Sequence, residues 1–265
     1  MLDIAAHPHL SAAAKRALPS FGPALSWRIT QRVAALIEIA AAMVQGKGAG
    51  AGWDMRSEIT AAVRFIQPGD TVFDVGANCG DWSREIKRRC PGVRLVMFEP
   101  QDACHAALAA IDGTLVRAAI GDAVGTAELH TPGGPAGNAS LHERRDSYWA
   151  GAEFHPITVP VTTLDAVWAD RIAFLKMDIE GHELAALRGA ARLLSGRMIG
   201  AIQFEFGSGN INSRTSFRDF WDLLTGRGYA INRLLPGGAL LPIPRYDESL
   251  EHYRGVSNYV AVAPA

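Results

Sequence analysis

VFDVGANCG, residues 72–80, decides the fold, because an apolar strand pattern runs directly into a glycine-rich turn. The pattern predicts a buried strand over Thr71 to Val75 and a helix over Trp82 to Cys90, so the turn joins a strand to a helix. Gly76 and Gly80 supply backbone freedom and remove side-chain bulk, which lets a ligand approach the main chain closely. This arrangement is typical of a nucleotide-binding turn.

Three polar residues indicate which class of ligand the turn binds. Asn78 stands where a dinucleotide-binding turn has its middle glycine, and asparagine tolerates left-handed backbone better than most residues do. Asp74 would repel a pyrophosphate, which binds bare N–H groups, and would attract a cationic sulfonium or ammonium group. Glu99 follows Gly80 by 19 residues, at the end of the next predicted strand, where an acid accepts hydrogen bonds from ribose hydroxyls. A cationic, ribose-bearing ligand is predicted, with a tight ligand-free turn as the alternative.

After this turn the sequence predicts strands and helices in alternation. Further strands are predicted at Val93 to Phe98, Thr114 to Ile120, Ile172 to Met177 and Ile199 to Phe206, and further helices at Asp102 to Ile111 and Glu183 to Leu194. This alternation predicts βαβ units with right-handed crossovers and a mainly parallel sheet. Tyr229 to Leu235 and Asn258 to Val262 flank a turn-rich stretch and predict a closing antiparallel pair.

The first 52 residues are predicted to form an N-terminal helical extension or cap, and residues 53–265 the main domain. Apolar residues recur at three- and four-residue spacing along one helical face: Ile29, Val33, Leu36, Ile37, Ala40 and Val44. The sequence GKGAGAG, residues 46–52, predicts a hinge. We interpret the extension as a helix packed on the main domain; a cap over a substrate site and a homodimer surface are the alternatives.

Composition excludes several classes of function. The 26 basic and 27 acidic residues are interspersed, which argues against a nucleic-acid partner. The three cysteines have neither CxxC nor metal-ligand spacing, so no disulfide or zinc site is predicted and a reducing cytoplasm is expected. The most apolar run, Val33 to Val44, is shorter than the roughly 20 residues that a membrane span needs, and Glu38 interrupts it. We expect a cytoplasmic protein with no membrane span.

Six stretches carry a family resemblance: VFDVGANCGDWS (72–83), MFEPQ (97–101), AAIGDAVGTAELH (118–130), VPVTTLDAV (159–167), FLKMDIEGHELAALRGAARLL (174–194) and QFEFGSGNINSRTSFRDFW (203–221). Through them the chain resembles the FkbM family of class I methyltransferases. The resemblance implies a Rossmann-like α/β sheet flanked by helices, mostly parallel, with seven strands and an antiparallel C-terminal pair. It also implies S-adenosylmethionine as the methyl donor and O-methylation of a small hydroxylated acceptor such as a sugar or natural product. By the same resemblance Asp122 accepts from the adenine amine; a simple turn into a hairpin is the alternative.

The end of the fourth strand, KMDIEGHE, offers candidates for the chemistry. An alcohol acceptor carries a proton that a positioned carboxylate or histidine can remove. Asp178 is the first candidate beside the reacting methyl group, because groups at the carboxyl ends of strands face the ligand crevice. Glu180 and His182 are the next candidates for the base. The structural alternatives are a Lys176–Asp178 ion pair and a Glu180 that caps the following helix.

Glu205, near the end of the fifth strand, is a further catalytic candidate, because a buried acid needs a purpose or a partner. It is predicted to act on the substrate, to act as the base or to pair with Arg214. Shared metal binding with Asp178 is disfavoured, so no metal is predicted. Two polar loops are expected at the same crevice, with a solvated surface loop as the alternative for the first. The first supplies Asn138, Ser140, His142, Arg144, Arg145, Tyr148 and Trp149, and the second Asn210, Asn212 and Arg214.

Three other functions stay open at this stage. A nicotinamide-dependent oxidoreductase can use a similar sheet, but Asp74 and Asn78 disfavour a pyrophosphate in the turn. An N-methyltransferase is a second alternative, because an amine nucleophile needs less help from a base. A non-catalytic cofactor-binding subunit is the third, and the presence of Asp178, Glu180 and Glu205 disfavours it.

Overall fold

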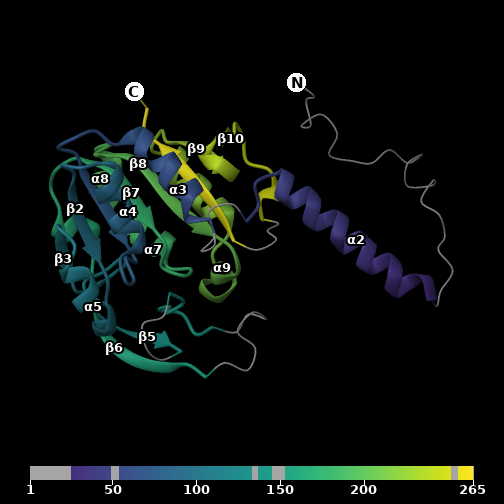
Figure 1. Cartoon of the computed structure of the whole chain (residues 1–265), viewed down its shortest axis with the longest axis horizontal. Coiled ribbons are helices and arrows are strands. Elements are labelled where there is room, and N and C mark those ends of the chain that lie inside the picture. Colours follow the sequence, from purple (N-terminus) through teal and green to yellow (C-terminus); the bar gives the residue numbers. More distant parts are fainter. Residues whose placement is uncertain (1–24, 49–53, 133–136, 145–152, 252–255, 265) are drawn as a thin grey trace. The chain divides into compact units, whose positions relative to one another are not determined.

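The computed structural model describes residues 25–48, 54–132, 137–144, 153–251 and 256–264 (Figure 1). By its contacts the chain divides between Ala41 and Ala42. The predicted N-terminal helix is present as α2, Leu25–Val44, and Leu36 and Ile37 on its apolar face are exposed. The assignment of residues 1–52 and 53–265 to two regions stays a prediction. Within the described ranges, no helix has the length and apolarity to cross a membrane.

A large mixed sheet forms the centre of the unit that starts at Ala42. Its strand order is β10-β9-β11-β8-β7-β1-β2-β3. The parallel strands are β1 Thr71–Val75, β2 Arg94–Phe98, β3 Thr114–Val116, β7 Ile172–Met177 and β8 Ile199–Phe206. The antiparallel ones are β9 Ala230–Leu234, β10 Leu240–Pro242 and β11 Ser257–Val262. The predicted class I sheet is confirmed, with the short strand β10 added at its edge.

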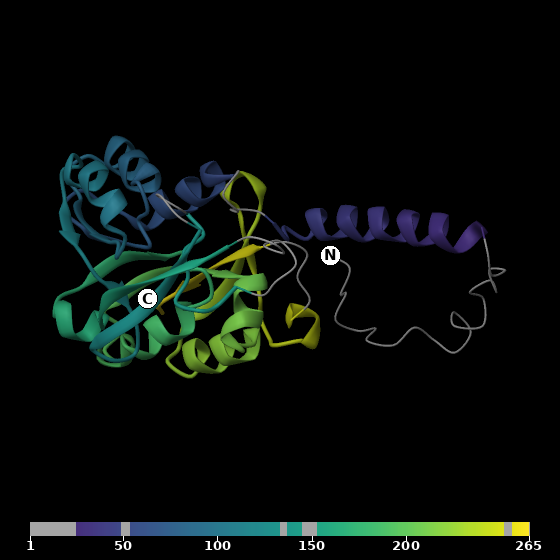
Figure 2. The ribbon, with the colours of Figure 1, turned by 90° about the horizontal axis from the view of Figure 1, so that it is seen from below.

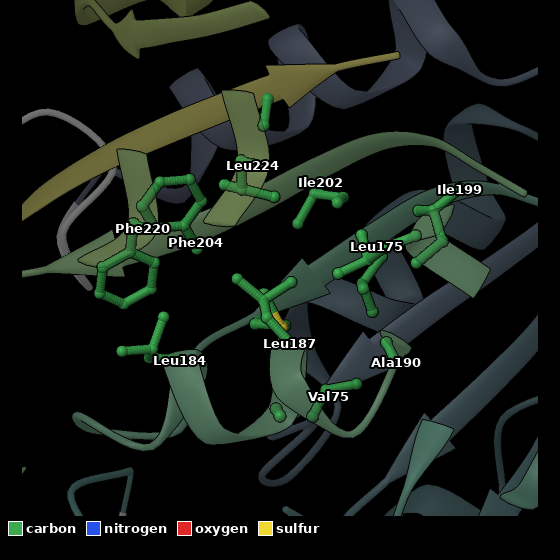
Figure 3. Packing of buried hydrophobic residues seen from close by; sticks show 14 of the residues in the cluster. Val75, Leu175, Leu184, Leu187, Ala190, Ile199, Ile202, Phe204, Phe220 and Leu224 are labelled. Carbon is green, nitrogen blue, oxygen red and sulfur yellow. The ribbon is translucent and has the colours of Figure 1, made fainter. Parts of the chain in front are cut away.

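Helices cover both faces of this sheet, as Figure 2 shows with blue helices on one side and green helices on the other. One face carries α3 Met55–Ala62, α4 Asp81–Arg89 and α5 Asp102–Ala109, which bury residues such as Ile59, Trp82 and Leu108. The other face carries α7 Glu183–Arg188, α8 Ala191–Ser195 and α10 Phe217–Thr225. In Figure 3 Leu184 and Leu187 point toward Leu175, Ile202 and Phe204 of the sheet. Strand alternation sends successive side chains to opposite faces, so each central strand feeds both cores.

The remaining helices are short. They are α6 Leu164–Val167, α9 Ser208–Ser213, and the 3₁₀ turns Val63–Phe65, Pro236–Gly238 and Glu248–Glu251. The helix α9 corrects one expectation, because the sequence 208–213 was predicted as a polar loop. Asn210 explains the helix: its side-chain oxygen accepts from the Gly207 N–H at 2.8 Å and closes the first turn.

Two predicted elements are broken in the structure. The strand expected over Thr114 to Ile120 ends at Val116, and β4, Ala119–Ile120, joins a different sheet. The helix expected over Glu183 to Leu194 breaks between α7 and α8 at Gly189. A Cβ on Gly189 would collide with the Gly121 carbonyl. The glycine therefore lets the backbone at this break lie close to the turn after β4.

A small second sheet, β4-β6-β5, projects from this point. It consists of β4, the strand β5 Gly125–Thr131 and the strand β6 His155–Thr162, with β5 and β6 antiparallel. The strand expected after the Asp122 turn is therefore present as β5, whereas the role of Asp122 toward the adenine stays a prediction. Residues 137–144 lie between β5 and β6 and fold back, since Ser140 and His130 exchange backbone hydrogen bonds of 2.8 and 3.1 Å. We call residues 137–144 the arm.

Candidate active site

A pocket with an empty volume of about 520 Å³ opens at the carboxyl ends of β1, β2 and β7. The turns after these strands form one wall, and residues 118–120 with the arm form the other. The location agrees with the general rule that ligands of open α/β sheets bind outside the carboxyl ends of the strands.

The glycine-rich turn lies under this pocket. Gly76 (φ 78°) and Asn78 (φ 46°) are both left-handed and line the pocket. A Cβ on Gly76 would collide with the carbonyl of Asp178, so the glycine permits contact between β1 and the end of β7. Gly80 (φ 89°) lies outside the pocket lining: it precedes α4 and packs against Leu108 and Ile111. Gly80 therefore serves helix packing, whereas Gly76 shapes the pocket.

Glu99 joins two backbone segments at the pocket wall. One carboxylate oxygen accepts from the Asn78 N–H at 2.8 Å, and the other accepts from the Gln101 N–H at 2.9 Å. The side chain is buried, and burial is the largest cause of its raised pKa, against hydrogen bonds from Gln101 and Asn78 that lower it. The oxygen that accepts from the Gln101 N–H also accepts from the Gln101 side-chain amide at 3.2 Å. The oxygen that binds Asn78 has a second lone pair, so Glu99 retains acceptor capacity there.

Asp74 does not line the pocket, which corrects the expectation that its charge faces the ligand. The residue is fully buried, alternates with Phe73 and Val75, and so points to the α3–α4 face. Ser83 donates to its carboxylate at 2.7 Å, and the Lys176 ammonium lies 3.1 Å away. Asp74 therefore balances a buried lysine beneath the pocket.

Asp178 stands at the rim, where β7 ends. Its side chain is 42% exposed and lines the pocket, and its carboxylate lies 3.7 Å from the Lys176 ammonium. Lys176 also donates to the Gly76 carbonyl at 3.1 Å. The predicted Lys176–Asp178 ion pair thus exists, but the shorter contacts of Lys176 are to Asp74 and Gly76. Asp178 keeps a solvent-accessible carboxylate next to the turn.

His182 lies at the opposite part of the pocket, beside Gly121. A Cβ on Gly121 would approach the Nε2 atom of His182 at 3.2 Å, while Nδ1 of His182 lies 3.0 Å from Nε2 of His142 on the arm. Burial, reinforced by His142, lowers the pKa of His182 to about 4, against the attraction of Asp122. Burial also lowers the pKa of His142, with His130 adding to the effect. Both rings are neutral near pH 7, and one donates to the other.

Both the side chain and the backbone carbonyl of Glu180 bind residues of the arm. Arg144 donates to its carboxylate at 2.6 Å, and the Ser140 hydroxyl donates to its backbone carbonyl at 2.8 Å. Glu180 has a left-handed backbone (φ 54°) and does not cap α7. Glu183 binds this turn instead, because its carboxylate accepts from the N–H groups of Ile179 at 2.9 Å and Gly181 at 3.3 Å.

Two candidate residues lie away from the pocket lining. Glu205 is held among carboxyl groups: burial first, and then Asp178, Glu180, Glu183 and Glu58, raise its pKa well above the usual value. Asp122 is exposed and lies next to Gly121. Arg145, Tyr148 and Trp149 lie outside the described residues. Within the described ranges, no group of three or more His, Cys, Asp or Glu side chains is arranged to hold a metal ion.

The apolar wall of the pocket is the part that the sequence did not reveal. It is formed by Ala118, Ile120 and Leu129, together with Ala139 and Leu141 of the arm. None of these residues is distinctive by type, and they come together only because the hairpin folds back. The alternation of polar and apolar residues in 138–141 is the available signal.

Comparison with known proteins gives a family match. The family model described as the methyltransferase FkbM domain matches residues 74–231. The chain is similar to the FkbM methyltransferase structure from Methylobacillus flagellatus, with 16% identity, a TM-score of 0.48 and coverage of 74% of this chain and 44% of that one. It is also similar to a TehB-like SAM-dependent methyltransferase from Corynebacterium glutamicum, with 14% identity, a TM-score of 0.42 and coverage of 92% and 100%.

The plantazolicin methyltransferase BpumL in complex with SAH is a third similar structure, with 10% identity, a TM-score of 0.39 and coverage of 79% and 82%. No curated protein matches the chain. The match over residues 74–231 covers both the glycine-rich turn and the end of β7.

Proposed function

Because the chain belongs to the FkbM methyltransferase family, we propose that its pocket binds S-adenosylmethionine and that it methylates a hydroxyl group of a small acceptor. The observation that carries the proposal is the meeting of Asn78 and Glu99 at one wall of the pocket, with Asp178 at its rim. The bound donor supplies a methyl group on a positively charged sulfur. The protein then contributes alignment, exclusion of water and removal of the acceptor's proton.

The two ends of the pocket differ in character, which orients the donor. The end formed by Ala118, Ile120 and Leu129 is apolar and suits a flat nucleobase. Glu99, between the ends, suits the two ribose hydroxyls as acceptor. The end formed by Gly76 and Asp178 is polar and suits the amino-acid part and the sulfonium. In this orientation the acceptor approaches over Asp178.

Asp178 is the group that we assign to the acceptor's proton. It is exposed at the polar end, where its carboxylate can reach an incoming hydroxyl. Glu180 is tied to Arg144 at 2.6 Å, so its carboxylate is not offered to the acceptor. His182 lies beside Gly121 at the nucleobase end, so we assign it to donor binding.

The class of acceptor is proposed as a sugar or a specialised metabolite. Support comes from the polar rim, where Asp178 is exposed and the Arg144 and Ser140 side chains hold the neighbouring turn. An amine acceptor is the second candidate, because a carboxylate at the rim also attracts a cation. We also propose three features that concern the rest of the chain. The exposed apolar face of α2 binds a second copy of the chain or forms a cap. The protein acts in the cytoplasm.

The first test compares Asp178→Asn with the unchanged protein. We expect turnover to fall by about 100-fold or more, the usual size of a general-base contribution, while the Kd for S-adenosylmethionine changes little. Donor binding is measured by isothermal titration and turnover by transfer of labelled methyl groups to a panel of sugars, alcohols and amines. The exposed Asp222→Asn on α10 is the matched control.

Three outcomes would count against the assignments. A fully active Asp178→Asn variant removes the residue from catalysis. Binding of NAD with no binding of S-adenosylmethionine overturns the methyltransferase site and favours an oxidoreductase. Labelling confined to amines replaces the hydroxyl with a nitrogen nucleophile.

A further inference from the structure

Two cysteines that are far apart in sequence meet behind the pocket. Cys79 belongs to the glycine-rich turn and Cys104 to α5, and their sulfur atoms lie 3.2 Å apart as free thiols. Cys104 is fully buried, whereas Cys79 is half-buried. The two side chains therefore aim at each other across the gap between the turn and the helix.

This pair is connected to the wall of the pocket. The Cys104 thiol lies 3.2 Å from the Asn78 side-chain oxygen, to which it donates. Asn78 in turn donates its backbone N–H to Glu99 at 2.8 Å. A chemical change at the sulfur pair thus acts on the same turn that lines the pocket.

We propose that Cys79 and Cys104 form a redox modification site, at which a hydroperoxide converts the two thiols into a disulfide. The Cys79 thiolate attacks the peroxide oxygen, the O–O bond breaks, and Cys79 becomes a sulfenic acid while the peroxide leaves as an alcohol or water. The Cys104 sulfur then attacks the Cys79 sulfur. The S–O bond breaks, the S–S bond forms, and the hydroxyl leaves with the thiol proton as water.

The different burial of the two thiols indicates which cysteine reacts with the peroxide first. Cys79 is the accessible partner, because it is half-buried in the glycine-rich turn before α4. Burial raises the pKa of Cys104 to about 12, and the neighbouring Cys79 and Glu99 add to the effect. Cys104 is thus protected from direct oxidation, and its closeness to Cys79 makes it the resolving partner.

The disulfide is expected to weaken donor binding. Its formation shortens the sulfur–sulfur distance from 3.2 Å to about 2.05 Å, so both cysteine side chains leave their present positions beside Asn78. It also removes the hydrogen bond that the Cys104 thiol donates to the side chain of Asn78. Asn78 has a left-handed backbone within the turn. This consequence rests on the proposed donor site, whereas the crosslink itself does not.

The crosslink is tested on the full chain with hydrogen peroxide. Intact mass is expected to fall by about 2 Da, and titratable thiols to fall from three to one. Peptide mapping should join Cys79 to Cys104, and dithiothreitol should reverse the change. Cys90→Ser is the matched control and should still form the crosslink, whereas Cys79→Ser and Cys104→Ala should not. The absence of this crosslink, or a crosslink that involves Cys90, overturns the proposal.

The effect on the site is tested by titration of S-adenosylmethionine into reduced and oxidised protein. We expect the oxidised form to bind about tenfold more weakly, and saturating donor to slow the oxidation, since coupling between two sites is reciprocal. An unchanged Kd after complete crosslinking overturns the link to the site. Reduced protein that crosslinks and never binds the donor overturns the proposed function and leaves the modification site standing.

Discussion

At the scale of single residues, Glu99 organises the pocket wall before any ligand is present. Its two carboxylate oxygens accept from the N–H groups of Asn78 and Gln101, which lie in different turns. A charge-assisted hydrogen bond is worth about 1.5–3 kcal/mol. The same carboxylate is the group proposed to bind the ribose, so it both shapes the wall and meets the ligand.

Glu99→Gln is therefore expected to weaken S-adenosylmethionine binding at least about tenfold, because an amide has only one acceptor oxygen. Isothermal titration measures the affinity. Asp74→Asn is the contrasting variant: Asp74 faces Lys176 beneath the pocket, so we expect a lower melting temperature and a smaller change in affinity. Unchanged affinity in Glu99→Gln would remove Glu99 from the donor site.

His182 is the second residue with a testable assignment. The pKa of about 4 leaves its ring neutral at assay pH. His182→Ala is expected to raise the KM for the donor several-fold and to leave kcat at saturating donor nearly unchanged. Steady-state kinetics separate the two constants, and His142→Ala should show a weaker effect of the same kind.

The pH dependence gives an independent check on His182. Because its folded-state pKa lies below the ordinary value, its contribution is present above about pH 6.5 and is lost as the pH falls through about 4. Donor affinity should decline as the pH falls through about 4, because the ring of the folded protein takes up its proton there. A loss of kcat in His182→Ala, with the disappearance of an inflection in its pH profile, would instead make His182 the base.

At the scale of elements, the arm is held to the turn after β7 by three side-chain contacts. They are Arg144 to the Glu180 carboxylate, Ser140 to the Glu180 carbonyl, and His142 to His182. The Arg144 side chain is 3% exposed, so this ion pair is shielded from water. The arm in turn supplies Ala139 and Leu141 to the pocket wall, so its attachment and the shape of the pocket are linked.

Arg144→Ala is expected to free the arm, because it removes the guanidinium group that donates to Glu180. Loss of one partner of a shielded pair costs up to about 3–5 kcal/mol locally. Hydrogen exchange should rise in residues 137–144, and donor affinity should fall. Arg218→Ala is the control, because its pair with Asp222 is exposed and worth about 1 kcal/mol at most. Equal exchange in both variants would contradict a holding role for the pair.

At the scale of the whole molecule, a cluster of buried carboxyl groups surrounds one lysine. Burial raises the pKa of Glu58 to about 8 and of Glu183 to about 7. Lys176 attracts Glu58 and opposes this shift, while Asp178 adds to it. Gln203, which interacts with Glu58, has a buried side-chain oxygen with no hydrogen-bond partner in the described part of the chain.

Stability should therefore fall as the pH rises. A carboxyl whose folded pKa exceeds its unfolded value binds its proton more tightly when folded, so its contribution is present below about pH 4.5 and is lost through about pH 7 to 8. We expect the melting temperature to drop by several degrees between pH 6 and 9, in the absence of ligand. Glu58→Gln should flatten this slope. An unchanged slope in the variant would show that Glu58 is ionised throughout.

Much of the fold was predictable because it depends on local patterns. The limits of β1, β7 and β8 agree with the apolar runs at Thr71, Ile172 and Ile199, since buried parallel strands are apolar along their whole length. The break between α7 and α8 was not predictable. It lies at Gly189, where only a residue without a side chain fits against Gly121 of a different element.

Some features of the candidate site were also predictable from the sequence, and others were not. Asn78, Glu99 and Asp178 follow strands whose order can be inferred, so their meeting at one edge follows from the parallel sheet. The pairing of Glu180 with Arg144, and of Cys79 with Cys104, depends on segments that return from elsewhere in the chain. Residue spacing carries no signal for such pairs.

The order of strands and helices, the glycine-rich turn and the family can all be inferred from the sequence, because periodicity and backbone freedom are local properties. Tertiary structure alone decided where each polar group points. Asp74 faces Lys176 rather than the pocket, because strand alternation places it on the α3–α4 side. It also decided which groups are buried together, and burial sets the charge of Glu58 and His182, since desolvation depends on every neighbour in space.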